Sequence, residues 1–99
     1  MGAPAKYKHW AGDADTVVYD GSCVLMGVMV EGGANATVVV VYDDDQIASP
    51  VAAKQLLPDI NVAATSTRLD WLGPDGVRCD EGISVVTDAN TGHTTIFWK

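Results

Sequence analysis

Residues 22–45 constrain the fold of this chain more than any other stretch. They contain two dense apolar runs, 23–30 and 37–42, joined by the glycine-containing stretch 31–36. The second run includes four consecutive valines, and β-branched side chains favour strands over helices. Two strand-like runs on either side of a short Gly-Gly-Ala-Asn linker predict a β-hairpin. Because the valine run has little polar alternation, we expect both of its faces to be covered, the outer one by a second sheet, a neighbouring loop or another protein molecule.

Strong turn sequences recur along the rest of the chain, at Asp20-Gly21, 73–76 and 88–92. Short runs rich in strand-forming residues lie between them, at 15–19, 61–72, 77–79, 83–87 and 93–99. About eight short strands separated by turns predict an all-β fold, which we interpret as an antiparallel β-sandwich. A jelly roll is one topology that fits; immunoglobulin-like and barrel topologies share the same local signals.

The side-chain pattern within two of these runs predicts which residues face the core. In 61–72 the residues Leu69 and Trp71 alternate with Arg68 and Asp70, which indicates one solvated face and core packing for Trp71. In 23–30 we expect the side chains to alternate as two faces, one with Cys23, Leu25 and Met29 and the other with Val24, Met26, Val28 and Val30. Gly27 interrupts this run, and a missing side chain in a strand indicates a bulge or a close-packed neighbour.

The segment 49–57 carries two conflicting signals. Ser49 followed by Pro50 is typical of a helix start, and Pro58 would end that helix after two turns. A helix of this length is marginal without strong packing, and two strands must be connected here. We therefore favour a strand at 49–57 and keep the helix as the alternative.

The chain of 99 residues fits one domain. Residues 1–10 combine a proline with small residues and predict an extended N-terminal arm, and residues 11–99 predict a single sandwich domain. Within the arm, residues 7–10 have the composition of a short edge strand.

The overall charge and hydropathy exclude several classes of partner. Thirteen acidic and six basic residues give a net charge of −7, which disfavours binding to nucleic acid or to anionic membranes. No apolar run approaches the ~20 residues that a membrane-spanning helix needs. The first ten residues contain no apolar signal-peptide core, so we expect synthesis in the cytoplasm without a secretion signal.

Two sets of side chains are candidates for metal binding. Asp43, Asp44 and Asp45 are consecutive, whereas calcium loops place their ligands at alternate positions with a glycine turn and a later glutamate. Neither of the two histidines, His9 and His93, has a Cys, His or acidic residue two to four positions later on the same strand face, as a zinc site would require. We interpret the aspartates as a solvated turn and the histidines as structural or surface residues, so no metal is predicted.

Signals for catalysis are equally weak. Cys23 and Cys79 lie in apolar runs and predict buried small side chains; a disulfide between them would need neighbouring strands with suitable geometry. Ser22, His93 and Asp20 are the residue types of a catalytic triad, but no Gly-x-Ser-x-Gly turn surrounds the serine. Glycine motifs for phosphates or dinucleotides are absent from the sequence. The sequence therefore predicts a protein that is not an enzyme and uses no cofactor.

Four stretches carry a resemblance to a known group of proteins: 20–28 (DGSCVLMGV), 41–43 (VYD), 76–86 (GVRCDEGISVV) and 94–98 (TTIFW). In this order they resemble small structural proteins of tailed bacteriophages, some of which are similar to capsid decoration proteins. The resemblance covers roughly residues 15–99 and consists of glycine and valine patterns rather than catalytic motifs. The segment 49–61 departs from the strand-turn-strand pattern that the resemblance implies.

The resemblance implies a non-enzymatic virion structural protein, a capsid decoration or cement protein that binds the capsid surface and stabilises the particle. Its partners would be other copies of the chain, most simply as a trimer, and the major capsid protein or another virion protein. It would be assembled in the host cytoplasm and located in the virion. For the protein interface we predict Tyr7, His9, Trp10 and Trp98, because aromatic side chains are common interface anchors.

Two alternatives belong to other functional classes. One is a glycan- or receptor-binding β-sandwich module on a phage head or tail, with Trp71 or Trp10 stacking on sugars. The other is a small hydrolase or metal-dependent protein built on residues 43–45 and a histidine.

Overall fold

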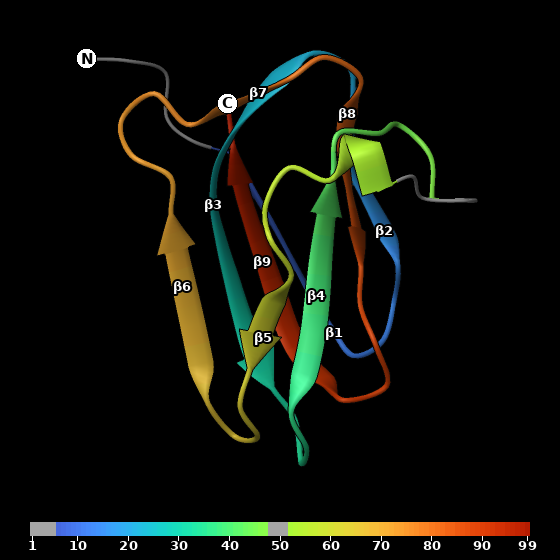
Figure 1. The fold of residues 1–99 in the computed structure, drawn as a ribbon, viewed down its shortest axis with the longest axis vertical. Coiled ribbons are helices and arrows are strands. Elements are labelled where there is room, and N and C mark those ends of the chain that lie inside the picture. The colour runs from blue at the N-terminus through green and yellow to red at the C-terminus, as the bar shows by residue number, and fades with distance from the viewer. Residues whose placement is uncertain (1–5, 48–51) are drawn as a thin grey trace.

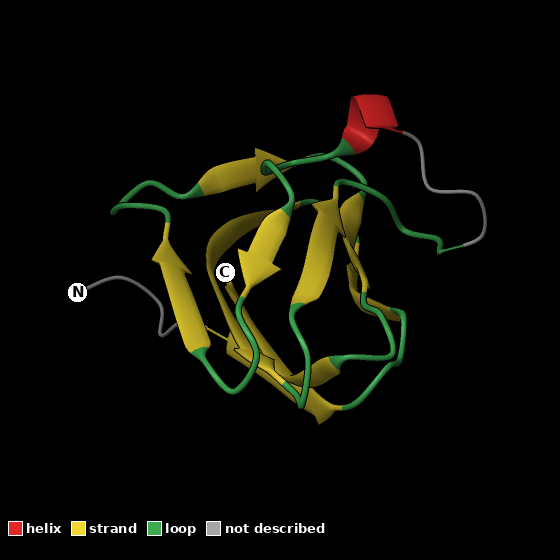
Figure 2. Ribbon diagram, turned by 60° about the horizontal axis from the view of Figure 1, so that its bottom comes forward, coloured by secondary structure: helices red, strands yellow, loops and turns green. Residues whose placement is uncertain are grey.

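Two antiparallel sheets packed face to face form the protein (Figure 1). The computed structural model describes residues 6–47 and 52–99. These residues form nine strands and one short 3₁₀ turn, which are β1 (Lys6–Ala11), β2 (Thr16–Asp20), β3 (Cys23–Gly32), β4 (Thr37–Tyr42), η1 (Ala52–Lys54), β5 (Ile60–Val62), β6 (Thr67–Trp71), β7 (Val77–Cys79), β8 (Gly82–Val86) and β9 (Thr91–Trp98). The all-β sandwich predicted from the sequence is confirmed. Figure 2 shows the strands surrounding the core, with η1 outside them.

The order of strands in the two sheets is that of a jelly roll. Sheet A has the order β1-β9-β3-β6, with β7 also paired to β3, and sheet B has the order β2-β8-β4-β5. The pairings are nested, since β1 pairs with β9, β2 with β8, β3 with β6 and β4 with β5. This nesting is what results when one long antiparallel hairpin of strands is rolled into two sheets.

The hairpin predicted between residues 23–30 and 37–42 is wrong. β3 lies in sheet A between β9 and β6, whereas β4 lies in sheet B between β8 and β5. The linker carries the chain from one sheet to the other, and Gly33 fixes the crossing by donating its N–H to the carbonyl of Asn90 (2.8 Å). Both apolar runs contribute to the core, but they face each other across it instead of pairing side by side.

The core lies between the sheets and is almost entirely aliphatic. Its members with 3% exposure or less include Leu25, Val28, Val30 and Ile96 of sheet A and Val39, Val41, Ile60, Val62, Ile83 and Val85 of sheet B. Burying each such side chain stabilises the fold by roughly 1.5–3 kcal/mol. The core covers one face of the valine run, whereas the other face is partly open within the described residues; cover of that face by another protein molecule stays a prediction. Val38 is 38% exposed, because the outer face of sheet B has no covering layer among the described residues.

A β-bulge in β3 explains its apolar pattern. The register with β9 shifts between Leu25 and Gly27, so the inward-facing positions change there from odd to even numbers. Cys23 and Leu25 are buried before the bulge, and Val28 and Val30 are buried after it. The strict two-face alternation predicted for residues 23–30 is therefore wrong, whereas the bulge or close neighbour predicted at Gly27 is confirmed.

The connection from β4 to β5 is mostly irregular. Residues 48–51, which include the predicted helix start at Ser49 and Pro50, lie outside the described part. Beyond them the chain forms η1, and Gln55 makes one isolated bridge to Tyr42. The strand favoured for 49–57 is therefore wrong from residue 52 onward, since the chain is held only at single points along this segment.

Residues 1–5 of the predicted N-terminal arm also lie outside the described part. Residues 6–11 form β1, which pairs antiparallel with β9, so the edge strand predicted at 7–10 is confirmed. In the described parts of the chain, no helix is long and apolar enough to cross a membrane.

The Asp43 carboxylate ties the end of β4 to the turn between β7 and β8. It accepts three backbone N–H bonds, from Asp80 (3.0 Å), Glu81 (2.9 Å) and Gly82 (3.3 Å). Partial burial alone would raise the pKa of Asp43, but these three donors and the ammonium of Lys54 outweigh it and hold the pKa below its ordinary value. The predicted aspartate turn is thus a structural link between β4 and the β7–β8 turn.

We expect Asp43→Asn to lower the free energy of unfolding at pH 7 by about 1–2 kcal/mol, because the amide oxygen accepts only weaker neutral bonds and the amide NH2 group cannot accept from a backbone N–H. The folded pKa is lower than the unfolded value of about 4, so the ionised carboxylate stabilises the fold above that pH. This advantage is lost as the pH falls through the folded pKa. Urea unfolding at pH 7 and near pH 2.5 measures both effects.

Asp45→Asn is the matched control, since the Asp45 side chain is exposed and no hydrogen bond of the described residues involves it. We expect its effect to stay within about 0.5 kcal/mol. A difference between wild type and Asp43→Asn that persists unchanged at low pH would contradict the role of the charge.

Candidate binding face

The outer face of sheet A gathers most of the large apolar side chains that the described residues expose. Tyr7 is 69% exposed, Leu69 58% and Trp71 55%, and all three lie on this face. Half-buried Met29 and Phe97 lie between them. We call these five residues the sheet A face. Scattered apolar side chains are normal on a protein surface, but a contiguous group indicates a site of interaction.

Strand register places the aromatic residues of this face in one row. Tyr7 of β1 is opposite Phe97 of β9, Phe97 is opposite Gly27 of β3, and Gly27 is opposite Trp71 of β6. Residues that are directly opposite in neighbouring strands point to the same face of a sheet. The row therefore crosses all four strands of the main path of sheet A.

Gly27 provides the space in which the Trp71 ring lies. A Cβ atom at position 27 would be 2.6 Å from Cε3 of Trp71, which is too close for a real contact. The indole also meets Phe97 edge-on, with ring centroids 6.0 Å apart and planes at 65°, and Phe97 meets Tyr7 at 6.4 Å. Such aromatic pairs hold their rings in defined positions. The Trp71 ring thus lies against the sheet while more than half of the residue stays open to solvent.

Beside the aromatic row lie the two histidines. Their rings stack, with centroids 5.2 Å apart and planes at 12°. Nδ1 of His9 is 2.6 Å from the hydroxyl oxygen of Thr95, its direct neighbour on β9. His93 is opposite Glu31 of β3. Both histidines therefore belong to the polar margin of the sheet A face, as the prediction of a structural or surface role requires.

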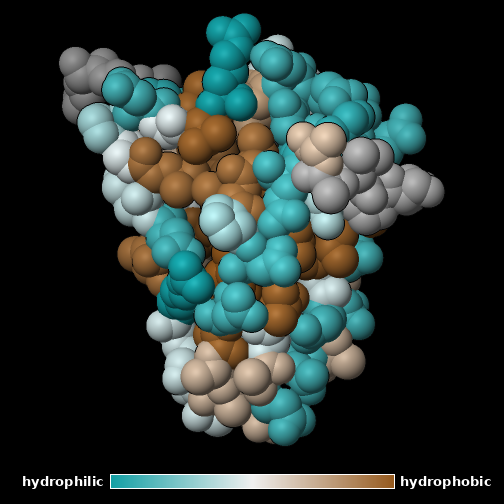
Figure 3. Space-filling model, in the orientation of Figure 1, coloured by the Kyte–Doolittle hydropathy of each residue, from teal (hydrophilic) through white to brown (hydrophobic). Residues whose placement is uncertain are grey.

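A cleft of about 410 Å³ lies between β6 and the chain that leads into β5. Apolar side chains of Leu57, Ile60 and Leu72 line it, together with the charged pair Arg68 and Asp70. Figure 3 shows hydrophobic surface gathered in the upper half of the view, over the chain leading into β5 and beside the end of β6. β6 therefore contributes to the sheet A face and to this partly apolar cleft, which Leu69 and Trp71 also line.

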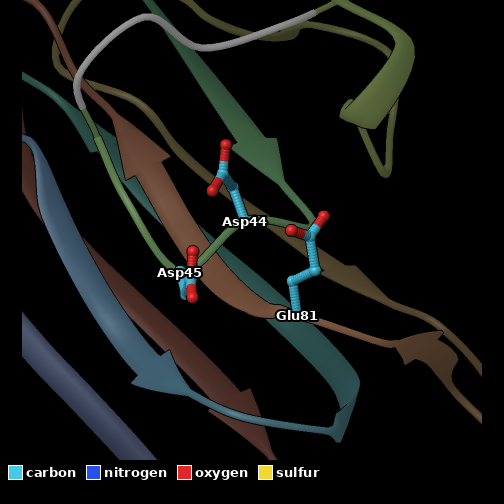
Figure 4. Close-up of side chains that lie close together, drawn as sticks. All are labelled: Asp44, Asp45 and Glu81. Carbon is cyan, nitrogen blue, oxygen red and sulfur yellow. The ribbon is translucent and has the colours of Figure 1, made fainter.

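Three carboxylates, of Asp44, Asp45 and Glu81, approach within 4.8 Å of one another (Figure 4). The ammonium of Lys54 is 2.9 Å from Glu81 and 3.8 Å from Asp44. These contacts balance part of the negative charge, and hydrogen bonding to Glu81 raises the pKa of Lys54. The cluster is explained as an ion-pair network around Lys54, in which Asp44 is buried and Asp45 and Glu81 are exposed.

Cys23 and Cys79 are opposite each other on β3 and β7, and both are buried and free. Burial, followed by the neighbouring thiol, raises the pKa of Cys79 to about 12, and burial also raises that of Cys23. Both thiols are therefore protonated at neutral pH and weak nucleophiles. The prediction of buried small side chains is confirmed.

The structure separates the four residues predicted for a protein interface. Tyr7 and His9 are exposed on the outer side of sheet A. Trp10 points inward and is partly buried against the core, and Trp98 is only 8% exposed, with its ring centroid 6.0 Å from that of Tyr19 on β2. Trp98 is a core residue in this fold and offers almost no surface to a partner.

The core packing predicted for Trp71 is wrong, and with it sequence reasoning missed the most prominent residue of the sheet A face. The alternation in residues 67–71 correctly placed Leu69 and Trp71 on one side of the strand. It did not tell which side faces the core. The glycine at position 27 was the available signal, since it indicated a close neighbour, but its partner Trp71 is distant in sequence.

Comparisons with models of protein families, with curated proteins and with solved structures give no match to this chain. The resemblance to bacteriophage structural proteins therefore stays a prediction.

We expect Gly27→Ala to displace the Trp71 ring while the fold is retained, because the ring is at the surface and can move away from the new methyl group. The loss of stability should stay near 1 kcal/mol. Acrylamide quenching of tryptophan fluorescence, with Trp71→Phe used to identify the Trp71 emission, measures the displacement. Unchanged quenching of Trp71 in a folded Gly27→Ala variant would contradict the role given to Gly27.

Proposed function

We propose that this chain is a non-enzymatic structural protein that binds another protein surface through the sheet A face. The observation that carries the proposal is the row of Tyr7, Phe97 and Trp71 across sheet A, flanked by exposed Leu69. Rigid aromatic side chains with large exposed area are the usual anchors of protein interfaces. In agreement with the resemblance found in the sequence, we propose a capsid decoration or other virion protein.

The reactive side chains of the described residues support a structural role. Asp43 is engaged by backbone amides, the carboxylate cluster by Lys54, and His9 by Thr95. Each of these groups is explained by contacts within the fold. The net charge of −7 favours a partner with a basic surface, because opposite charges steer association.

A second candidate function is glycan binding. It is favoured by one observation, the exposed Trp71 indole that Gly27 and Phe97 hold against the sheet. An aromatic ring with one open face can stack on the apolar side of a sugar ring. The two candidates use the same residue and differ in the partner.

We expect Trp71→Ala to weaken binding to the particle at least about tenfold, since a central aromatic anchor contributes about 2 kcal/mol or more. Val38→Ala is the control, because Val38 is exposed on the opposite sheet. Co-sedimentation of purified protein with particles of the encoding virus that lack it measures the binding. Equal binding by Trp71→Ala and wild type would contradict the proposed docking face.

A glycan array with wild type and Trp71→Ala separates the second candidate from the first. Sugar binding that Trp71→Ala abolishes, together with absent co-sedimentation, would replace the structural proposal with glycan binding. Co-sedimentation without any glycan signal would remove the second candidate.

A further inference from the structure

β6 is a free edge of sheet A. It pairs with β3 on one side, and no other described strand lies along its second side (Figure 1). Exposed edge strands tend to pair with other chains unless proline, a bulge or a cover prevents it. The five residues of β6 contain no proline, their register with β3 is unbroken, and Leu69 and Trp71 are exposed.

The hydrogen-bonding pattern shows which backbone groups are available at this edge. Gly32 donates its N–H to the carbonyl of Ser66, and Leu72 donates its N–H to the carbonyl of Met26. In an antiparallel pair the bonded positions alternate, so Arg68 and Asp70 also direct their backbone groups towards β3. The N–H and C=O groups of the intervening residues, Thr67, Leu69 and Trp71, therefore point away from the sheet.

We propose that β6 pairs antiparallel with β6 of a second copy of this chain, about a two-fold axis through Leu69. In this register Leu69 faces Leu69 of the other copy, and Thr67 faces Trp71. These are the positions whose backbone groups are free, so each opposed pair can exchange two hydrogen bonds. β6 of one copy therefore matches β6 of the other copy both in its free backbone groups and in its exposed apolar side chains.

The opposite charges of Arg68 and Asp70 favour this register. On the inward side of β6, Arg68 of each copy would lie opposite Asp70 of the other. Within one chain these residues already form a pair at 3.0 Å, with side chains 45% and 30% exposed. Charged inward-facing residues usually deter edge pairing. Here their signs are opposite and their positions are related by the two-fold axis, so pairing places each charge next to an opposite one.

The contact would join two copies of sheet A into one sheet, with the order β1-β9-β3-β6-β6-β3-β9-β1. The two sheet A faces would then lie side by side on one surface, and two linked faces bind a repetitive partner more tightly than one. A two-fold contact predicts a dimer in place of the trimer that the resemblance implies. The inference rests on the edge of β6 and holds for either candidate function.

Charge exchange at positions 68 and 70 tests the proposal. Because edge contacts between short strands are small, we expect dimers of the wild type at concentrations between about 1 µM and 500 µM, measured by sedimentation velocity. Arg68→Asp and Asp70→Arg should each weaken self-association at least about tenfold, because like charges then face each other. The loss of the pair within one chain has little effect, since that pair is exposed.

Two rescues distinguish the proposed register from general loss of stability. An equimolar mixture of the Arg68→Asp and Asp70→Arg proteins should form mixed dimers. In such a dimer, β6 of one copy carries two aspartates and faces β6 of the other copy, which carries two arginines. The double variant Arg68→Asp with Asp70→Arg should dimerise as the wild type does. Circular dichroism checks that each protein is folded.

The proposal would be overturned by a wild type that stays monomeric over the whole range. It would also be overturned by single variants that associate as the wild type does, or by failure of both rescues in folded proteins. Particle binding by a monomeric wild type would leave the proposed function intact while removing this inference.

Discussion

The bulge in β3 is the constraint on which the rest of sheet A depends. β9, β6 and β7 all pair with β3. The bulge changes which side chains of β3 point inward, and the residues opposite them on the paired strands point the same way. Cys23 and Leu25 enter the core on one side of the bulge, and Val28 and Val30 on the other. Without the shift, one half of β3 would direct its apolar side chains into solvent. Gly27 at the bulge also leaves room for Trp71.

Local patterns predicted where most strands lie, except at 49–57 and within 61–72, where β5 and β6 are separate strands. They were insufficient to assign strands to sheets. The turns at Asp20-Gly21 and 73–76 and the all-β class followed from residue types alone. The assignment of β3 and β4 to different sheets did not follow, because a short glycine-rich linker can either close a hairpin or cross a sandwich. In a jelly roll the partners of a strand are mostly distant in sequence, as β1 and β9 are.

The binding face was hidden from sequence reasoning for a related physical reason. Alternation of Leu69 and Trp71 with charged residues defines two sides of β6, but burial depends on what the neighbouring layer covers. At β6 the sandwich opens into a cleft, so Arg68 and Asp70 face inward and the apolar side faces out. Trp98 shows the converse, since the sequence predicted an interface residue while packing between the two sheets buries it.

Hydroxyl-radical footprinting of the protein, alone and bound to its particle, tests most directly the claim that sheet A is the docking surface. Oxidation of an aromatic or sulfur-containing side chain falls when a partner covers it. The account predicts protection of Tyr7, Met29 and Trp71 on binding, with Tyr42 of sheet B oxidised as before. Protection of Tyr42 with unchanged oxidation of Trp71 would show that the opposite sheet binds the partner and would contradict the account.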